Sequence, residues 1–356
     1  MPTRILIIKP SALGDVATTL PLLCDVHAAR PEARIDWLIH PAYVPVVQGH
    51  EALHEAVVFD RKHLGAWWYR PSATGRFTGL LRALREKRYN IVIDAQGLFR
   101  SGFLARVTGA KMRIGFSHAR EGAALAYTHK IRLPGKGKAM LAVDRMRALG
   151  VPLGTDPGSP AQFRLPLQPA GVEAAAKLVS DPFVAVIPGA RWNTKRWPID
   201  RYTQVVQNLL DAGQHVVLLG SPDEKPLCDE ILAQIGNRKS KIENLHNLSA
   251  QTDIATMIAL LARARLVLAN DSGPLHIAAA LGTRVVALYG PTSPSFVGPY
   301  GQLENVLRQE APCHPCRLRE CDHHSCMNAL TVERVWERVA AGLEMETRGQ
   351  GDKETA

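Results

Sequence analysis

The sequence predicts an α/β protein with two doubly wound domains, and two observations support this prediction. Short apolar runs rich in β-branched residues alternate with segments of helical length along most of the chain of 356 residues. A run rich in Gly and Pro at 150–160 (GVPLGTDPGSP) interrupts this alternation near the middle of the chain. We therefore expect domains at 1–160 and 161–330. A helix at 331–345, which could pack back on the first domain, and a disordered polar tail at 346–356 are expected to follow.

The first domain begins with an apolar run at 4–9 (RILIIK), which is typical of a buried parallel strand. Further strands are expected at 35–39, 56–59, 90–95 and 111–116, with helices between them, the first at 16–29. The loop after the first strand contains Ser11, Gly14 and Asp15 and lacks both glycine-rich phosphate-binding patterns, GxGxxG and GxxxxGK[ST]. Asp15 is therefore either the N-cap of the helix or a base at the ligand-binding edge of the sheet.

The second domain repeats the alternation, with strands expected at 183–187, 215–219, 242–245, 266–269 and 285–288. Their loops carry the polar or glycine-bearing segments PGARWNTKRWP (188–198), GSPDE (220–224) and NLS (247–249). Because the carboxyl ends of parallel strands meet at one edge of a sheet, these loops are expected to converge on one crevice. No GxGxxG follows 183–187, which argues against a nicotinamide-binding domain.

The segment 266–294 (LVLANDSGPLHIAAALGTRVVALYGPTSP) predicts a strand, a helix and a second strand. Asp271 and Ser272 are good N-cap residues, Gly273 allows close backbone approach, and Pro274 suits a first helical turn. Free backbone N–H groups at 272–275 would then lie at the positive end of a helix, which is a ready-made anion site. The plainer alternative is that these four residues only start a helix.

The composition is that of a globular protein, with 46% apolar and 21% charged residues. No apolar run approaches the ~20 residues that span a bilayer, and no signal peptide is evident, so a cytoplasmic protein is expected. The net charge of +10 is divided unevenly, with +12 on 1–165 and −2 on 166–356. The surplus suggests an anionic partner such as nucleic acid, an acidic membrane or an anionic substrate, unless it only aids solubility. Within this basic half, the segment 61–70 mixes basic residues with aromatics, which suits a membrane surface or an amphiphilic acceptor.

Five motifs in order and spacing, KPSALGD (9–15), PGARWNTKRWP (188–198), LLGS (218–221), NLS (247–249) and NDSGPLHIAAALGTRVVALYGPTSP (270–294), closely resemble the bacterial lipopolysaccharide heptosyltransferases of glycosyltransferase family 9. The resemblance spans most of the chain. It implies the GT-B architecture, with two Rossmann-like domains facing a central cleft, the first for the acceptor and the second for the nucleotide sugar. The first half of the chain looks more like heptosyltransferase I and the second half as close to heptosyltransferase II, so the acceptor position stays open.

The resemblance also implies roles for individual residues. Asp15 takes the role of general base, and Lys195 contacts the departing diphosphate. Donor binding would involve Gly14, Arg191, Thr194, Lys195, Ser221, Glu224, Leu248, Asp271, Ser272, Gly273 and His276. Acceptor binding would involve Ser11, Arg61, Lys62 and Arg120. One departure stands out: where heptosyltransferase I has two threonines, this chain has Ala190 and Arg191, which replaces hydroxyl contacts to phosphate by a guanidinium.

The implied reaction moves heptose from ADP-L-glycero-β-D-manno-heptose to the inner core, on Kdo–lipid A or heptosyl-Kdo–lipid A, with inversion. A single displacement needs one base, and Lys195 with the helix N-terminus could stabilise the leaving group without a metal, since no Asp-X-Asp motif is evident. The expected partners are ADP-heptose and an anionic lipid A-type acceptor at the inner face of the cytoplasmic membrane, with no nucleic acid and a monomeric chain. The alternatives are another nucleotide-sugar donor, a sugar-nucleotide epimerase and a non-catalytic polyanion-binding protein.

Four cysteines near the C-terminus, Cys313, Cys316, Cys321 and Cys326, have the spacing C-x2-C-x4-C-x4-C. Four thiolates could hold a structural Zn²⁺, although structural zinc sites usually separate two close pairs by a longer loop. The alternative is reduced cysteines that pack a loop. We therefore expect no metal or cofactor in catalysis and leave a structural zinc ion open.

Overall fold

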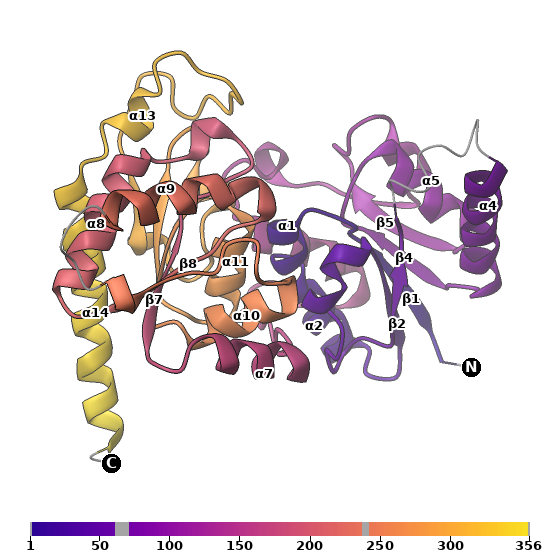
Figure 1. Cartoon of the computed structure of the whole chain (residues 1–356). Coiled ribbons are helices and arrows are strands. Elements are labelled where there is room, and N and C mark those ends of the chain that lie inside the picture. Colours follow the sequence, from indigo (N-terminus) through magenta and orange to yellow (C-terminus); the bar gives the residue numbers. More distant parts are fainter. Residues whose placement is uncertain (1, 61–70, 237–241, 355–356) are drawn as a thin grey trace. The chain divides into compact units, whose positions relative to one another are not determined.

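The computed structural model describes residues 2–60, 71–236 and 242–354, and it divides into two compact units, 1–166 and 167–356 (Figure 1). The division lies close to the boundary at 160 that the sequence predicts. Each unit contains one fully parallel six-stranded sheet with helices on both faces, so the predicted doubly wound α/β class is confirmed. Each unit is described separately below.

The sheet of the first unit has the strand order β3-β2-β1-β4-β5-β6. Its strands are β1 (Arg4–Ile8), β2 (Arg34–Ile39), β3 (Glu55–Val58), β4 (Ile91–Asp94), β5 (Met112–Phe116) and β6 (His129–Ile131). Its helices are α1 (Leu13–Ala17), α2 (Leu20–Ala29), α4 (Pro71–Glu86), α5 (Phe99–Val107) and α6 (Ala142–Arg147), with 3₁₀ turns η1 (Pro41–Val46), η2 (Ala123–Ala126), η3 (Pro134–Gly137) and η4 (Ala148–Leu153). The sequence did not predict β6, because its residues HKI are polar and exposed or half-buried at the sheet edge.

The single helix expected at 16–29 is two helices, which corrects the sequence prediction. α1 ends at Ala17, and the hydroxyls of Thr18 and Thr19 both donate to the carbonyl oxygen of Asp15, at 3.2 and 2.7 Å. Pro21 lies in the first turn of α2, where its missing N–H costs no hydrogen bond. Asp15 is therefore not an N-cap but the third residue of α1, with its carboxylate turned back to the N–H of Ala12 at 3.2 Å.

A buried carboxylate, Asp94, organises the carboxyl edge of the first sheet at the end of β4. It accepts hydrogen bonds from the N–H groups of Gln96 and Gly97 at 2.9 and 3.0 Å and from the hydroxyl of Tyr127 at 2.6 Å. A Cβ on Gly115 would lie 2.3 Å from the ring of Tyr127, so β5 needs glycine there for the ring to approach. Burial raises the pKa of Asp94, and these donors oppose that rise.

The sheet of the second unit has the strand order β12-β11-β10-β7-β8-β9. Its strands are β7 (Phe183–Ile187), β8 (His215–Leu218), β9 (Leu245–Asn247), β10 (Leu266–Asn270), β11 (Val285–Tyr289) and β12 (Val306–Arg308). Its helices are α7 (Pro169–Leu178), α8 (Ile199–Asp211), α9 (Lys225–Gly236), α10 (Ile254–Arg263), α11 (Gly273–Ala280), α12 (Pro294–Val297), α13 (Ser325–Asn328) and α14 (Val332–Glu354), with 3₁₀ turns η5 (Asn193–Lys195), η6 (Pro222–Glu224), η7 (Ile242–Asn244) and η8 (Leu303–Asn305). α8, α9 and α14 cover one face, and α7, α10 and α11 cover the other (Figure 1).

The C-terminal helix α14 packs on its own unit. It contacts α8 and the strands β10 and β11, and its side chains Val335 and Val339 are fully buried in the core of the second unit. The helix extends to Glu354, beyond the end at 345 that the sequence predicts. Packing on α8, β10 and β11 therefore fixes the first turns of α14 in the second unit.

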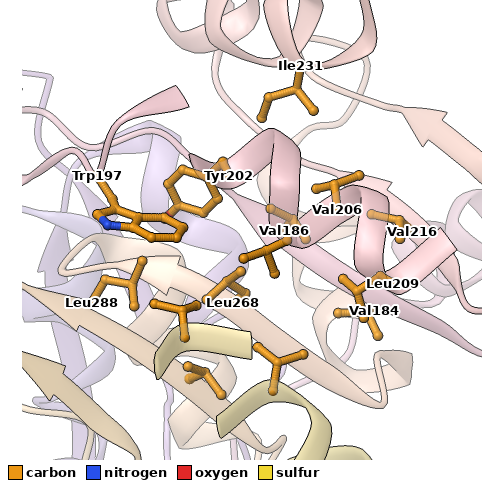
Figure 2. Close-up of a cluster of buried hydrophobic side chains, with 14 of the residues drawn as sticks. Val184, Val186, Trp197, Tyr202, Val206, Leu209, Val216, Ile231, Leu268 and Leu288 are labelled. Carbon is orange, nitrogen blue, oxygen red and sulfur yellow. The ribbon is translucent and has the colours of Figure 1, made fainter. Parts of the chain in front are cut away.

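The core of the second unit also includes an aromatic pair that comes from the loop after β7. Trp197 is 1% exposed and meets Tyr202 edge to face, with ring centroids 5.1 Å apart. Figure 2 shows the two rings together, with Leu268 and Leu288 of the central strands below Trp197. The indole N–H donates to the carbonyl oxygen of Leu330 at 2.9 Å, so the polar edge of the ring is satisfied as well. The end of this polar loop is thus fixed by core packing.

We predict that Tyr127→Phe destabilises the first unit by about 1–3 kcal/mol, because it leaves an oxygen of the buried Asp94 carboxylate without its donor. Since the folded-state pKa of Asp94 is raised, the cost should be largest above that pKa and shrink as the pH falls through it and the carboxyl becomes neutral. Urea unfolding at several pH values measures the effect. Tyr43→Phe, at a half-buried tyrosine, is the control. Equal stability of Tyr127→Phe and wild type at neutral pH would contradict the prediction.

Candidate active site

The loop 188–198 and the end of β10 are held together by Asn270, which is fully buried. Its side-chain amide donates to the carbonyl oxygen of Pro188 at 2.7 Å, and its side-chain oxygen accepts from the N–H of Trp197 at 3.2 Å. One side chain thus fixes both ends of the loop. Because Trp197 is anchored in the core, the residues between these ends have a defined place at the carboxyl edge of the sheet.

Asp271 lies next in the chain and is the centre of the site. Its carboxylate accepts from Lys195 Nζ at 2.6 Å and from the hydroxyl of Thr292 at 2.6 Å, and His276 Nε2 lies 3.7 Å from its other oxygen. Burial alone would raise the pKa of Asp271, but the nearby His276 and Lys195 lower it to about 2. The structure therefore brings three predicted donor residues, Lys195, Asp271 and His276, into one cluster around a buried carboxylate.

The N-terminus of α11 adjoins this cluster. Ser272 is its N-cap, with extended backbone angles, and Gly273 and Pro274 form its first turn. The Ser272 hydroxyl is buried and has no hydrogen-bond partner among the described residues, and its side chain does not cap the helix. A buried hydroxyl without a partner costs free energy, so a ligand oxygen at this helix end would satisfy it. The predicted anion site thus lies beside a paired Lys195 and an unpaired hydroxyl.

Three residues at this site were missed by sequence reasoning about donor binding. Thr292 was not selected, although its hydroxyl is buried against Asp271. Trp192 has the ammonium of Lys195 4.8 Å from its ring centroid and the guanidinium of Arg319 at 5.3 Å. Thr292 and Trp192 each lie within a recognised motif, GPTSP at the end of 270–294 and PGARWNTKRWP at 188–198, but neither side chain was selected from it. Nothing in the sequence near Arg319 indicates that its loop reaches Trp192.

Thr194 serves a different contact from the one proposed for it. It is 2% exposed, and its hydroxyl donates to the carbonyl oxygen of Leu318 at 2.7 Å. This bond ties η5 to the loop that carries Arg319. The contact makes Thr194 a link between the turn of Lys195 and the loop of Arg319, and its predicted contact with the donor stays a prediction.

Glu224 and Ser221 form a capping box after β8. The Glu224 carboxylate accepts from both the N–H and the hydroxyl of Ser221 at 2.9 Å. A Cβ on Gly189 would lie 2.3 Å from the Glu224 carboxyl carbon, so the PGA segment needs glycine for this side chain to pack against it. The loops after β7 and β8 therefore meet at Glu224.

Leu248 and Arg191 complete the predicted donor set. Leu248 is buried, its N–H donates to the carbonyl oxygen of Leu218 at 3.0 Å, and its carbonyl accepts from the N–H of Gln251 at 3.1 Å. The Leu248 carbonyl oxygen has a second lone pair, which could accept a hydrogen bond from a bound donor nucleotide. Arg191 is exposed at the edge of the loop, beside the buried Ala190.

The predicted residues of the first unit lie along one edge of its own sheet. Ser11, Gly14 and Asp15 follow β1, and Arg120 follows β5, with only β4 between these two strands. The Arg120 N–H donates to the carbonyl oxygen of Gly97 in the β4 loop at 3.0 Å, and its side chain is exposed. Asp15 is also exposed, so its carboxylate is accessible. Arg61 and Lys62 lie outside the described residues.

The four C-terminal cysteines are free thiols. Cys313, Cys316 and Cys321 lie in the long loop between β12 and α13, and Cys326 lies in α13 itself. Burial raises the pKa of Cys326, and charge on Cys313, Cys316 and Cys321 would raise it further, so the thiols are neighbours. Among the described residues, however, the one group whose potential ligand atoms all lie within 4.8 Å is Asp36, His54 and Glu55. A tetrahedral metal would have to draw the cysteine sulfurs closer together. The acidic group is occupied by cations instead, with Lys87 3.5 Å and Arg4 3.7 Å from Asp36.

Residues 77–326 match the family model described as glycosyltransferase family 9 (heptosyltransferase). The chain belongs to glycosyltransferase family 9. Lipopolysaccharide heptosyltransferase 1 of Pseudomonas aeruginosa is 30% identical, over 90% of this chain and 88% of its own length. Lipopolysaccharide heptosyltransferase 2 of Escherichia coli K12 is 30% identical, over 96% of this chain and 99% of its own length. The solved structure of E. coli ADP-heptose lps heptosyltransferase II has a TM-score of 0.78 at 27% identity and covers 97% of this chain and 100% of that chain.

Family 9 membership makes this chain a glycosyltransferase and confirms both the predicted family and the GT-B fold class. The two curated relatives are equally identical to it, so identity alone does not separate the first acceptor position from the second. The clustered residues Lys195, Asp271 and His276 belong to the unit that contains most of the recognised motifs.

For this glycosyltransferase we predict that Lys195→Ala destabilises the second unit by roughly 3 kcal/mol, because it leaves the Asp271 charge buried without its cation. The double variant Lys195→Ala/Asp271→Asn should recover most of that stability without recovering affinity for ADP. The folded-state pKa of Asp271 is depressed, so the ion pair stabilises the fold above the unfolded pKa near 4, and this contribution is lost as the pH falls to about 2. Thermal melts against pH and calorimetry with ADP measure both effects. A double variant that binds ADP as wild type does would contradict the role of Lys195.

Metal analysis of untagged protein decides between a structural zinc ion at the cysteines and reduced cysteines that pack a loop. A structural site would contain about one Zn²⁺ per chain, and Cys313→Ser would lose the metal and lower the melting temperature. Cys24→Ser is the matched control, because Cys24 is a free cysteine of the first unit and is not part of the C-x2-C-x4-C-x4-C run. Metal-free protein with unchanged stability after Cys313→Ser would leave the cysteines as packing residues.

Proposed function

We propose that this chain is an inverting heptosyltransferase of lipopolysaccharide core biosynthesis. It would move heptose from ADP-L-glycero-β-D-manno-heptose to the inner core, on Kdo–lipid A or heptosyl-Kdo–lipid A. The observation that carries the proposal is the buried Lys195–Asp271 pair at the N-terminus of α11, which suits the departure of a nucleoside diphosphate. Its relatives are named as lipopolysaccharide heptosyltransferases, which supports the choice of sugar and acceptor.

The leaving group would be stabilised by residues of the second unit. Departure of ADP leaves negative charge on its terminal phosphate as the bond to the sugar breaks. Lys195 is 17% exposed, so its ammonium can face a phosphate while Asp271 holds it in position. The N–H groups at the start of α11 and the Ser272 hydroxyl offer further donors. Such fixed donors stabilise developing charge without reorganising during the reaction, and no step needs a metal.

The attacking hydroxyl would be deprotonated by Asp15 of the first unit. Inversion at the anomeric carbon is one displacement, so a single base on the acceptor side suffices. The Asp15 carboxylate is exposed, and Oδ2 accepts from the Ala12 N–H, which fixes the side chain at the edge of the sheet. Arg120, two strands along the same edge, would face acidic groups of the acceptor.

The charge of the first unit agrees with an anionic acceptor. Residues 1–165 have a net charge of +12, whereas 166–356 have −2. A lipid A-type acceptor carries phosphates and acidic sugars, so the basic half is suited to it. None of the helices in the described residues combines the length and the hydropathy that crossing a bilayer requires. We propose that the enzyme works as a monomer at the inner face of the cytoplasmic membrane.

The deciding experiment is mass spectrometry of the products formed from ADP-heptose with Kdo–lipid A or heptosyl-Kdo–lipid A. Addition of one heptose to one acceptor supports the proposal and settles the acceptor position. The same reaction with EDTA should keep most of its activity. Transfer from a UDP-sugar, or epimerisation of the donor without transfer, would replace the proposed reaction.

We predict that Asp15→Asn lowers kcat by about 100-fold or more, a common size for the loss of a general base. The asparagine oxygen can still accept from the Ala12 N–H, so α1, the melting temperature and ADP affinity should change little. Asp200→Asn, at an exposed position in the first turn of α8, is the matched control. Near-normal turnover by folded Asp15→Asn would return Asp15 to a purely helical role.

A further inference from the structure

Three large apolar side chains of the first unit are exposed within one small region. Phe99 is 60% exposed and Phe103 41% exposed on α5, and Leu125 is 83% exposed on η2. Single exposed apolar residues are normal on protein surfaces, but neighbouring ones mark contact sites. We refer to Phe99, Phe103 and Leu125 as the α5 patch.

Contacts within the first unit hold the members of the α5 patch near one another. Phe99 and Phe103 are four residues apart on one helix, so they share a face. The Phe103 ring stacks with Phe77 of α4, with centroids 6.5 Å apart. On the other side, the Phe99 N–H donates to the Glu121 carboxylate at 3.2 Å, just before η2 and Leu125.

The fold itself does not need these side chains on the surface. α5 buries its opposite face, Ser101, Gly102, Leu104 and Ala105, against the sheet and η2. A Cβ on Gly102 would lie 3.1 Å from the backbone of Ala123, so α5 and η2 are in close contact through their small residues. The packing of α5 on the sheet and on η2 therefore does not use the two phenylalanines, and Phe103 adds only its contact with Phe77 of α4.

Cations surround the α5 patch. Arg100 and Arg106 are exposed on α5 itself, Arg76 on α4 and Arg120 in the loop before η2. Among the described residues none of these four forms an ion pair, whereas Arg82 of α4 is paired with Glu86. Apolar side chains ringed by arginines match the chemistry of a bilayer surface with anionic headgroups.

The location of the α5 patch suits a lipid-linked acceptor. α5 begins directly after the β4 loop, and Phe99 is its first residue. That loop lies between the loops of Asp15 and Arg120 on the carboxyl edge of the sheet. A membrane that touched the patch would therefore hold its headgroups next to this edge.

We propose that the α5 patch, with Arg76, Arg100 and Arg106, docks this enzyme on an anionic lipid leaflet. The inference rests on the proposed function for the identity of the acceptor, but membrane binding itself needs neither donor nor acceptor. Phenylalanine and leucine enter the interface between headgroups and acyl chains, and the arginines contact lipid phosphates. Neither contribution alone gives stable binding, so both sets of residues are required.

The test is co-sedimentation of the full-length protein with vesicles of phosphatidylglycerol and phosphatidylethanolamine, compared with phosphatidylcholine vesicles. Wild type should bind the anionic vesicles at least tenfold better, and raised salt should weaken that binding. The variant Phe99→Ser/Phe103→Ser/Leu125→Ser should lose at least fivefold in binding, and Arg100→Gln/Arg106→Gln should lose the salt-sensitive part. Both variants should keep the wild-type melting temperature.

The matched control is Val151→Ser/Val172→Ser/Leu303→Ser, which removes three apolar side chains of 40–48% exposure elsewhere. Equal losses in this control, equal binding to both lipid compositions, or wild-type binding by the patch variant would overturn the proposal. A patch variant that changes the mass of the protein in solution without changing vesicle binding would assign the patch to a second copy instead. Normal vesicle binding with no heptose transfer would refute the proposed function alone.

Discussion

The ion pair between Lys195 and Asp271 is the interaction on which the site of the second unit depends. An ionised carboxylate that is 5% exposed is stable only if its charge is compensated, and Lys195, Thr292 and His276 together provide that compensation. Each partner comes from a different part of the chain: the loop after β7, the loop after β11 and the first turn of α11. The pair therefore fixes three loops relative to one another. The low pKa of Asp271 follows from its contacts with His276 and Lys195.

The pair in turn depends on core packing, which connects the chemistry to the fold. Trp197 is inserted among the side chains of the central strands (Figure 2). Asn270 at the end of β10 binds the loop at both Pro188 and Trp197. Because these anchors flank Lys195, its backbone is defined before any ligand is present. Cation–π contact with Trp192 further limits the side chain. A donor site built in this way is organised in advance, which is what electrostatic stabilisation of a leaving group requires.

The sequence predicted features that depend on neighbouring residues and missed those that depend on distant ones. The start of α11 was predicted because Ser272, Gly273 and Pro274 carry their own backbone preferences. The Lys195–Asp271 contact joins residues 76 positions apart, so local patterns could not show it, and only resemblance to a family suggested both residues. The same limit explains Thr292 and Arg319, whose roles arise from folded loops. The break at Thr18 and Thr19 was missed because hydroxyl contacts to the Asp15 carbonyl are not an apolar pattern.

We propose that charge balance accounts for Ala190 and Arg191, which stand where the resemblance to heptosyltransferase I predicts two threonines. Asp271 offsets the charge of Lys195, so the pair as a whole is nearly neutral. The Lys195 ammonium could face a phosphate, but it adds little net positive charge. A bound diphosphate therefore needs more positive charge than the pair supplies. Arg191 lies in the loop of Lys195, and Arg319 shares the Trp192 ring with it. In this chain Ala190 is buried, and we propose that the exposed guanidinium groups of Arg191 and Arg319 take the place of hydroxyl contacts to a phosphate. A guanidinium can form two parallel hydrogen bonds to a phosphate, so the exchange favours charge compensation over short neutral contacts.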